Sequence, residues 1–101
     1  MKLLEGKVAI VTGAARGIGA AIALKFAEQG ADIAFTYVSD SSAEKAAALE
    51  TQLQAFNIKA RAYKSNAADF VQCETFVNDV LKEFGKIDVL INNAGAIQLT
   101  P

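Results

Sequence analysis

The sequence predicts an α/β protein built on a doubly wound parallel sheet, and three observations support this prediction. Short apolar runs of strand length alternate with longer segments in which apolar residues recur every three or four positions. Glycines follow the periodic segments where helices would end, and a glycine-rich loop joins the first run to the first periodic segment. Helices between successive strands require parallel pairing with right-handed crossovers. With the glycine-rich loop at the first turn, this pattern predicts four strands in the order 3-2-1-4.

The expected elements follow one another without an internal domain boundary. The first and last strands are continuous apolar runs, as in strands buried on both faces. The third strand alternates apolar and polar residues, so we expect it to have one wet face and to lie at a sheet edge. In order, we expect a strand at residues 8–11, a helix from 17 to about 29, a strand at 33–37, a helix capped by Ser41 or Ser42, a strand at 58–63, a helix capped by Asp69, and a strand at 89–91.

Each expected helix carries an apolar stripe. In the first helix Ile18, Ile22 and Phe26 recur every fourth position, and Gly30 supplies a stop. The only cysteine lies in the third stripe, where it is expected to be a small buried hydrophobe rather than a nucleophile. The second stripe contains Ala46, Leu49, Leu53 and Phe56, and the third contains Cys73, Phe76, Val77, Val80 and Phe84, with Gly85 ending that helix.

Composition narrows the classes of partner. With 101 residues and 52% hydrophobic content, the chain can bury a core but has room for one domain. Ten basic and eleven acidic residues give a net charge of -1 without a basic cluster, which argues against nucleic acid. The apolar runs are far shorter than the roughly 20 residues that cross a bilayer, and the start does not resemble an export signal. We therefore expect a soluble, cytoplasmic protein without a membrane partner.

The loop Thr12-Gly-Ala-Ala-Arg-Gly-Ile-Gly19 is the candidate ligand-binding segment of the chain. Gly13 allows a tight turn, Gly17 lets the backbone approach a ligand, and Gly19 allows close packing of the helix. The first amides of the helix then attract a pyrophosphate. Glycines that serve packing alone are the alternative, but the position between a strand and a helix favours a dinucleotide. A phosphate-loop NTPase is excluded because the Gly-Lys-Ser/Thr ending is missing.

These residues resemble the Thr-Gly-x-x-x-Gly-x-Gly fingerprint of the short-chain dehydrogenases/reductases, a family with the Rossmann fold. Asn92-Asn93-Ala94-Gly95, after the fourth strand, resembles the second signature of that family. The resemblance covers the whole chain, residues 1–101, and implies that it is the N-terminal, cofactor-binding half of a single Rossmann domain. Its implied cofactor-binding residues are Gly13, Arg16, Gly17, Ile18, Gly19, Tyr37, Ser39, Asn66, Ala67, Asn93, Ala94 and Gly95.

Within this resemblance, Asn66 and Ala67 would meet the adenine, although most relatives have Asp where this chain has Asn66. Asn92 is expected to tie the strand end to its neighbours or to cap the loop. The resemblance also bears on cofactor choice, because an NAD enzyme usually has an acidic residue at the end of the second strand, where this chain has Tyr37. That replacement, with Arg16 and Ser39 nearby, favours NADP. Asp40 is the opposing candidate, interpreted as a solvated turn residue.

The sequence is most like the 3-oxoacyl-(acyl-carrier-protein) reductases, although sugar and alcohol dehydrogenases share nearly all of these motifs. The implied reaction is NADPH-dependent reduction of a 3-oxoacyl thioester on acyl-carrier protein, or of another small carbonyl substrate, by a homo-oligomer, a tetramer in this family. The implied catalytic Ser, Tyr and Lys are missing, because neither Tyr37 nor Tyr63 has Lys four residues later. No metal site is expected.

Three interpretations therefore remain open. The chain is part of a longer reductase, a stand-alone nucleotide-binding module, or a non-catalytic subunit that associates with a complete relative. The first is favoured because the chain ends where the family continues into its next helix. In each case we expect the 101 residues alone to be inactive, to bind the dinucleotide weakly and to aggregate through the last strand, whose outer edge has no partner.

Overall fold

The computed structural model describes residues 2–15, 17–66 and 68–93, and it confirms the expected alternation of strands and helices. The strands pair in parallel in the order β3-β2-β1-β4, which is the predicted order. The elements are β1 (Val8–Val11), α1 (Gly17–Glu28), β2 (Asp32–Tyr37), the short 3-10 helix η1 (Asp40–Ser42), α2 (Ala43–Gln54), β3 (Ala60–Lys64), α3 (Phe70–Phe84) and β4 (Val89–Ile91).

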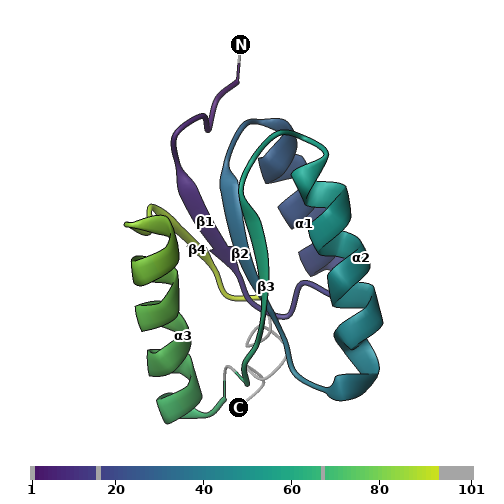
Figure 1. The fold of residues 1–101 in the computed structure, drawn as a ribbon, viewed down its shortest axis with the longest axis vertical. Helices are drawn as coiled ribbons and strands as arrows, with labels where there is room; N and C mark the ends of the chain where they lie inside the picture. Colours follow the sequence, from purple (N-terminus) through teal and green to yellow (C-terminus); the bar gives the residue numbers. More distant parts are fainter. Residues whose placement is uncertain (1, 16, 67, 94–101) are drawn as a thin grey trace.

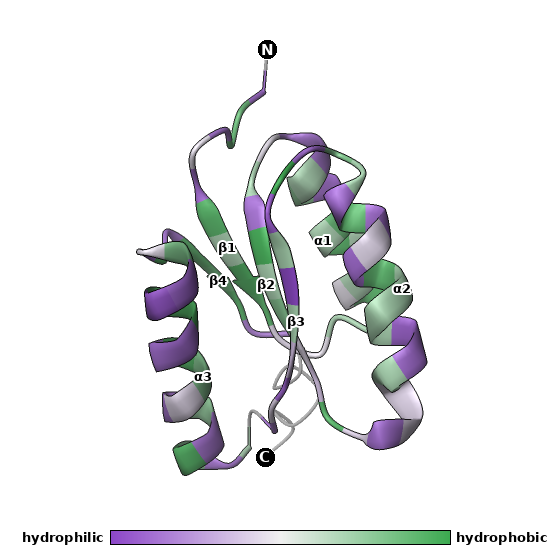
Figure 2. Cartoon of the chain, in the orientation of Figure 1, coloured by the Kyte–Doolittle hydropathy of each residue, from purple (hydrophilic) through white to green (hydrophobic). Residues whose placement is uncertain are grey.

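Helices cover both faces of the sheet, as a doubly wound fold requires (Figure 1). α1 and α2 lie on one face, and α3 lies on the other (Figure 1). The central strands β1 and β2 are largely apolar between these layers, whereas α2 and α3 also carry many hydrophilic residues (Figure 2). Phe35 packs toward α1 and α2, and Ile10 packs toward α3. Parallel pairing brings the carboxyl ends of all four strands to one edge, where ligands bind in such sheets.

The buried face of α1 differs from the predicted stripe. The buried residues are Gly19, Ala23 and Ala27, four positions apart, so the helix packs on the sheet through its smallest side chains. Ile18 is 72% exposed, and Ile22 and Phe26 are only half-buried at the flank of the core. The four-residue period was recognised correctly, but it was assigned to the wrong residues.

α3 begins and ends as expected. The Asp69 carboxylate accepts a hydrogen bond from the Gln72 amide at 3.1 Å, and Gly85 ends the helix with a φ of 86°. Phe76 and Val80 of its stripe are buried, whereas Cys73 is half-buried and therefore less enclosed than predicted. By contrast, α2 begins after Ser42 without a side-chain cap, because the serine hydroxyls bond to one another instead.

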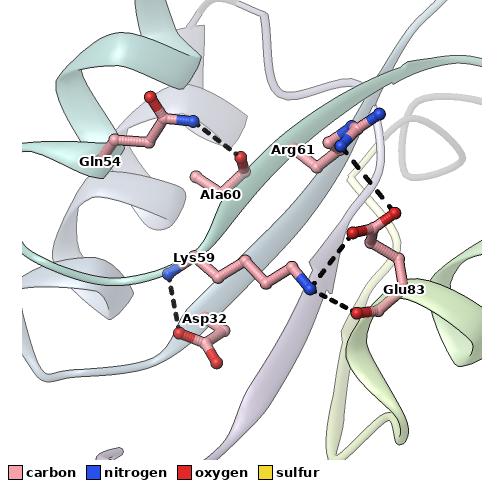
Figure 3. Close-up of polar contacts among 6 residues, drawn as sticks. All are labelled: Asp32, Gln54, Lys59, Ala60, Arg61 and Glu83. Carbon is pink, nitrogen blue, oxygen red and sulfur yellow. Dashed lines mark hydrogen bonds and ion pairs between the residues drawn. The ribbon is translucent and has the colours of Figure 1, made fainter.

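β3 is an edge strand, as predicted, but its second face is not simply wet. Tyr63 contacts Phe76 of α3 in an edge-to-face arrangement with ring centroids 5.2 Å apart. Around β3, Gln54 of α2 donates to the Ala60 carbonyl, and Lys59 and Arg61 contact Glu83 of α3 (Figure 3). Side chains from both helix layers therefore cover this edge.

β4 has the predicted bounds but is not buried as expected. Leu90 is 62% exposed, and Val89 and Ile91 are half-buried. The strand pairs with β1 on one side only, and the described residues place no strand along its outer edge. Within the described ranges, no helix combines the length and apolar character that crossing a bilayer requires.

Candidate functional site

The glycine loop begins with a tight turn that β2 holds in place. Gly13 has a φ of 66°, its N–H donates to the Thr36 hydroxyl at 2.9 Å, and the Ala14 N–H donates to the Thr36 carbonyl at 3.0 Å. Because only glycine readily adopts a positive φ, this turn requires glycine at position 13. Sequence reasoning missed Thr36, although a threonine directly after the apolar run Ile33-Ala34-Phe35 was the available signal.

Gly19 lies where the start of α1 contacts both the glycine loop and the segment after β4. A Cβ on this residue would lie 2.7 Å from the Gly13 carbonyl oxygen, 2.8 Å from Asn93 Nδ2 and 2.9 Å from Ala14 Cα. Two of these three atoms belong to the backbone, so they cannot rotate away. Close packing was the predicted role of Gly19, and the structure adds that its neighbours are the loop itself and the segment after β4.

The asparagines after β4 fasten that strand to the glycine loop. The Thr12 hydroxyl donates to Asn92 Oδ1 at 3.1 Å, and Asn93 Nδ2 donates to the Gly13 carbonyl at 3.2 Å. Asn92 thus joins the strand end to its neighbour, as expected. Two motifs about eighty residues apart in the sequence form one hydrogen-bonded unit at the carboxyl edge of the sheet.

The start of α1 is open to a ligand. Gly17 has a φ of 67°, and a Cβ there would meet nothing within 4 Å. Gly17 and Ile18 are exposed, and the first turn of the helix contains no acidic residue. The first amides of a helix lack intrahelical acceptors and carry the positive end of its dipole, so the geometry suits an anion.

Beside this turn is a pocket of about 240 Å³, which opens between the glycine loop and the end of β2. It brings together the predicted residues Gly13, Tyr37 and Ser39, and its lining is completed by Ala15, Val38 and Ser42. The pocket lining thus contains an aromatic ring, Tyr37, and the hydroxyls of Ser39 and Ser42. These residues fit a dinucleotide, because a pyrophosphate can meet the helix start while an adenosine lies toward Tyr37.

Asn66 lies at the carboxyl end of β3, where its side chain organises the turn before α3. Its Oδ1 accepts from the Ala68 N–H at 2.9 Å, and its own N–H donates to Gln72 Oε1 at 2.9 Å. The amide oxygen of Asn66 therefore takes part in the turn before α3.

Asp40, the acidic residue that could oppose NADP, forms an ion pair. Its Oδ1 lies 2.6 Å from Lys64 Nζ. Hydrogen bonding and charge attraction by Lys64 lower the pKa of Asp40 and raise that of Lys64. Both groups are therefore charged at neutral pH. Sequence reasoning identified Asp40 but missed Lys64, because only the pairing of β2 with β3 brings the two together.

Four of the predicted site residues lie outside the described residues. Burial, followed by the negative charge of Glu83, raises the pKa of Tyr63. Among residues 2–15, 17–66 and 68–93, no group of three or more His, Cys, Asp or Glu side chains could hold a metal ion. The four residues without a description are Arg16, Ala67, Ala94 and Gly95.

Comparison with known proteins gives consistent results. The sequence profile of the family described as short chain dehydrogenase matches residues 7–101. An NADP-dependent mannitol dehydrogenase of Alternaria alternata is 47% identical over 94 residues, covering 91% of this chain and 35% of the relative. A 3-oxoacyl-(acyl-carrier-protein) reductase of Staphylococcus aureus is 43% identical over 89 residues, covering 88% of this chain and 35% of that enzyme.

A solved structure agrees with the fold. The crystal structure of a blue fluorescent protein from a metagenomic library, in complex with NADPH, superposes with a TM-score of 0.88 at 52% identity. The match covers 91% of this chain and 37% of that one. This chain therefore spans little more than a third of the length of the proteins that it matches.

Proposed function

This chain belongs to the short-chain dehydrogenase family, and from that membership we propose that it is the dinucleotide-binding part of an NADP(H)-dependent oxidoreductase. The observation that carries the proposal is the joining of the glycine loop to Asn92 and Asn93 beside an open helix start. A bound NADP(H) supplies the hydride that such an enzyme exchanges with its substrate. The residues of this chain bind and orient the cofactor.

The glycine loop performs the binding role in this proposal. Gly17 and Ile18 are exposed, and their backbone amides bind the pyrophosphate. Gly19 lets α1 lie close to the glycine loop, so that these amides face the pyrophosphate. Asn93, which follows the neighbouring strand β4, holds the loop by donating a hydrogen bond to the Gly13 carbonyl. By the resemblance to the family, we assign Ala94 and Gly95 to the ribose and nicotinamide part of the cofactor, and Asn66 and Ala67 to the adenine.

The preference for NADP(H) follows from the end of β2. A carboxylate there would repel a 2′-phosphate, and this chain has Tyr37 instead, with Ser39 in the same pocket. Arg16 is the proposed cation for that phosphate. The mannitol dehydrogenase named above is NADP-dependent, and the metagenomic protein was crystallised with NADPH, which supports the same choice.

For the substrate we favour a 3-oxoacyl thioester on acyl-carrier protein, reduced to the 3-hydroxyacyl form in the cytoplasm by a homo-oligomer. A polyol or sugar substrate is the second candidate, because the mannitol dehydrogenase matches at slightly higher identity than the reductase. The 101 residues contain no Tyr followed four positions later by Lys, so the proposed catalytic residues lie in a further segment.

The cofactor proposal is tested by titrating the full-length protein with NADPH and NADH, following nicotinamide fluorescence. We expect tighter binding of NADPH, and Arg16→Ala should weaken NADPH binding about ten- to a hundredfold, the effect of losing a charged partner. Equal affinity for the two cofactors in the unmodified protein would contradict the proposal. Oxidation of NADPH with an acetoacetyl thioester, compared with reduction of NADP by mannitol, decides between the substrates.

A further inference from the structure

An ion pair between neighbours of two pocket-lining residues joins the segment after β2 to the end of β3. Lys64 is the register partner of Tyr37 in the sheet, and Asp40 directly follows Ser39. Tyr37 and Ser39 both line the pocket in which the proposed function puts the adenosine end of the cofactor. The 2.6 Å contact between Lys64 Nζ and Asp40 Oδ1 therefore lies at the end of the site where NAD and NADP differ.

Asp40 lies three residues beyond the end of β2, and a carboxylate that reaches the adenosine ribose from there would influence which cofactor binds. Free to move, it can accept hydrogen bonds from both ribose hydroxyls of NAD, and it repels the 2′-phosphate of NADP. The Asp40 side chain is 90% exposed, so its ion pair with Lys64 is the contact that restrains the position of the carboxylate. Lys64 occupies one of its oxygens and offsets its charge.

We propose that Lys64 is a positioning residue for cofactor selectivity, which acts by binding Asp40 and so keeps that carboxylate from favouring NAD over NADP. This inference rests on the proposed function, because it assumes that the adenosine end of the cofactor lies beside Tyr37. It explains how a chain with an acidic residue close behind β2 can still accept a 2′-phosphate. In this proposal Lys64, at the end of β3, contributes to the choice between NAD and NADP, whereas the sequence motifs indicate only the glycine loop and β2.

The test measures the dissociation constants of NADPH and NADH for the full-length protein and four variants. In Lys64→Met the released Asp40 should lower the preference for NADPH roughly fivefold to tenfold, as expected for two anions several ångströms apart in a water-like medium. Lys64→Arg should retain the preference, since the ion pair survives. The double variant Lys64→Met/Asp40→Asn should restore it to within about twofold.

A matched control is Lys59→Met, which removes another exposed lysine that pairs with a carboxylate, Glu83. Lys59 precedes β3 at its opposite end, so this variant should leave the preference unchanged. The loss in Lys64→Met should also shrink between 0.05 M and 0.5 M salt, because screening weakens the repulsion. A merely structural role of Lys64 would affect both cofactors equally and would show little dependence on salt.

The outcomes separate the two proposals. If the unmodified protein binds neither cofactor or prefers NADH, the proposed function itself fails. If it prefers NADPH and Lys64→Met keeps that preference, only the present inference is overturned. Failure of Asp40→Asn to rescue Lys64→Met would also overturn it, because Lys64 would then contact the phosphate directly. Selective loss with rescue is the result that supports it.

Discussion

The substitution Gly19→Ala tests most sharply how the loop, α1 and the second motif fit together. Helix propensity alone favours it, because alanine is about 1 kcal/mol better than glycine in a helix interior. The added methyl group, however, would lie 2.7–2.9 Å from Gly13, Asn93 and Ala14. The sign of the change in the free energy of unfolding therefore decides whether propensity or packing dominates at this position.

The magnitude follows from the two opposing effects. Overpacking costs typically 1–3 kcal/mol, and the upper part of that range applies because two of the contacts are with backbone atoms. Subtracting the gain in propensity leaves a net loss of roughly 1–2 kcal/mol. With a urea dependence of about 2 kcal/mol per M, the middle of the usual range, the unfolding midpoint should fall by about 0.5–1 M.

The assay is urea unfolding of the protein followed by circular dichroism, together with NADPH titration. The control is Ala21→Gly at an exposed position of the same helix, which should lose about 1 kcal/mol through propensity alone. Both variants should thus be destabilised, although their substitutions run in opposite directions. An increase in the midpoint for Gly19→Ala would refute the described packing.

Three further predictions follow from the structure. Asp69→Ala should destabilise the protein by about 1 kcal/mol in urea unfolding, whereas Ser42→Ala, at a helix start without a side-chain cap, should change stability by a few tenths at most. Glu50→Ala should promote self-association, measured by sedimentation, because the Glu50 carboxylate covers the Ala62 N–H on the outer edge of β3; unchanged sedimentation would contradict this. The pKa of Asp88 is lowered in the folded state, chiefly by the hydrogen bond that its carboxylate accepts from the Val8 N–H. The stabilising effect of Asp88 is therefore present above the pKa of the unfolded carboxyl and is lost as the pH falls through the folded value. Asp88→Asn should flatten the dependence of stability on pH below about pH 4, and an unchanged slope would be inconsistent with that role.

The sequence predicted the fold well because its signals are local. Runs of strand length, the Asp69 cap and the glycine after α3 each depend on a few neighbouring residues, and the parallel order follows from chain connectivity. The buried face of α1 was wrong because hydrophobicity favoured Ile18 and Ile22, whereas close approach to the sheet selects Gly19 and Ala23. Steric fit between layers is a tertiary property that periodicity alone does not contain.

Part of the local geometry at the candidate site was also predicted, whereas the binding roles of its residues stay predictions. The roles of Gly13 and Gly19 followed from their spacing, and the structure agrees with both. The contributions of Thr36 and Lys64 were missed, since each depends on which residues of neighbouring elements stand opposite one another. The exposure of Leu90 was missed for a related reason, because an apolar run does not reveal whether both of its sides are covered.

The central claim is that the glycine loop and the pocket beside it form the dinucleotide site. The most direct test is a crystal structure of the full-length protein grown with NADP. The pyrophosphate should lie on the amides of Gly17 and Ile18, with the adenosine beside Tyr37 and its 2′-phosphate toward Ser39. A dinucleotide bound at another edge of the sheet, or one with its nicotinamide beside Tyr37, would contradict the account.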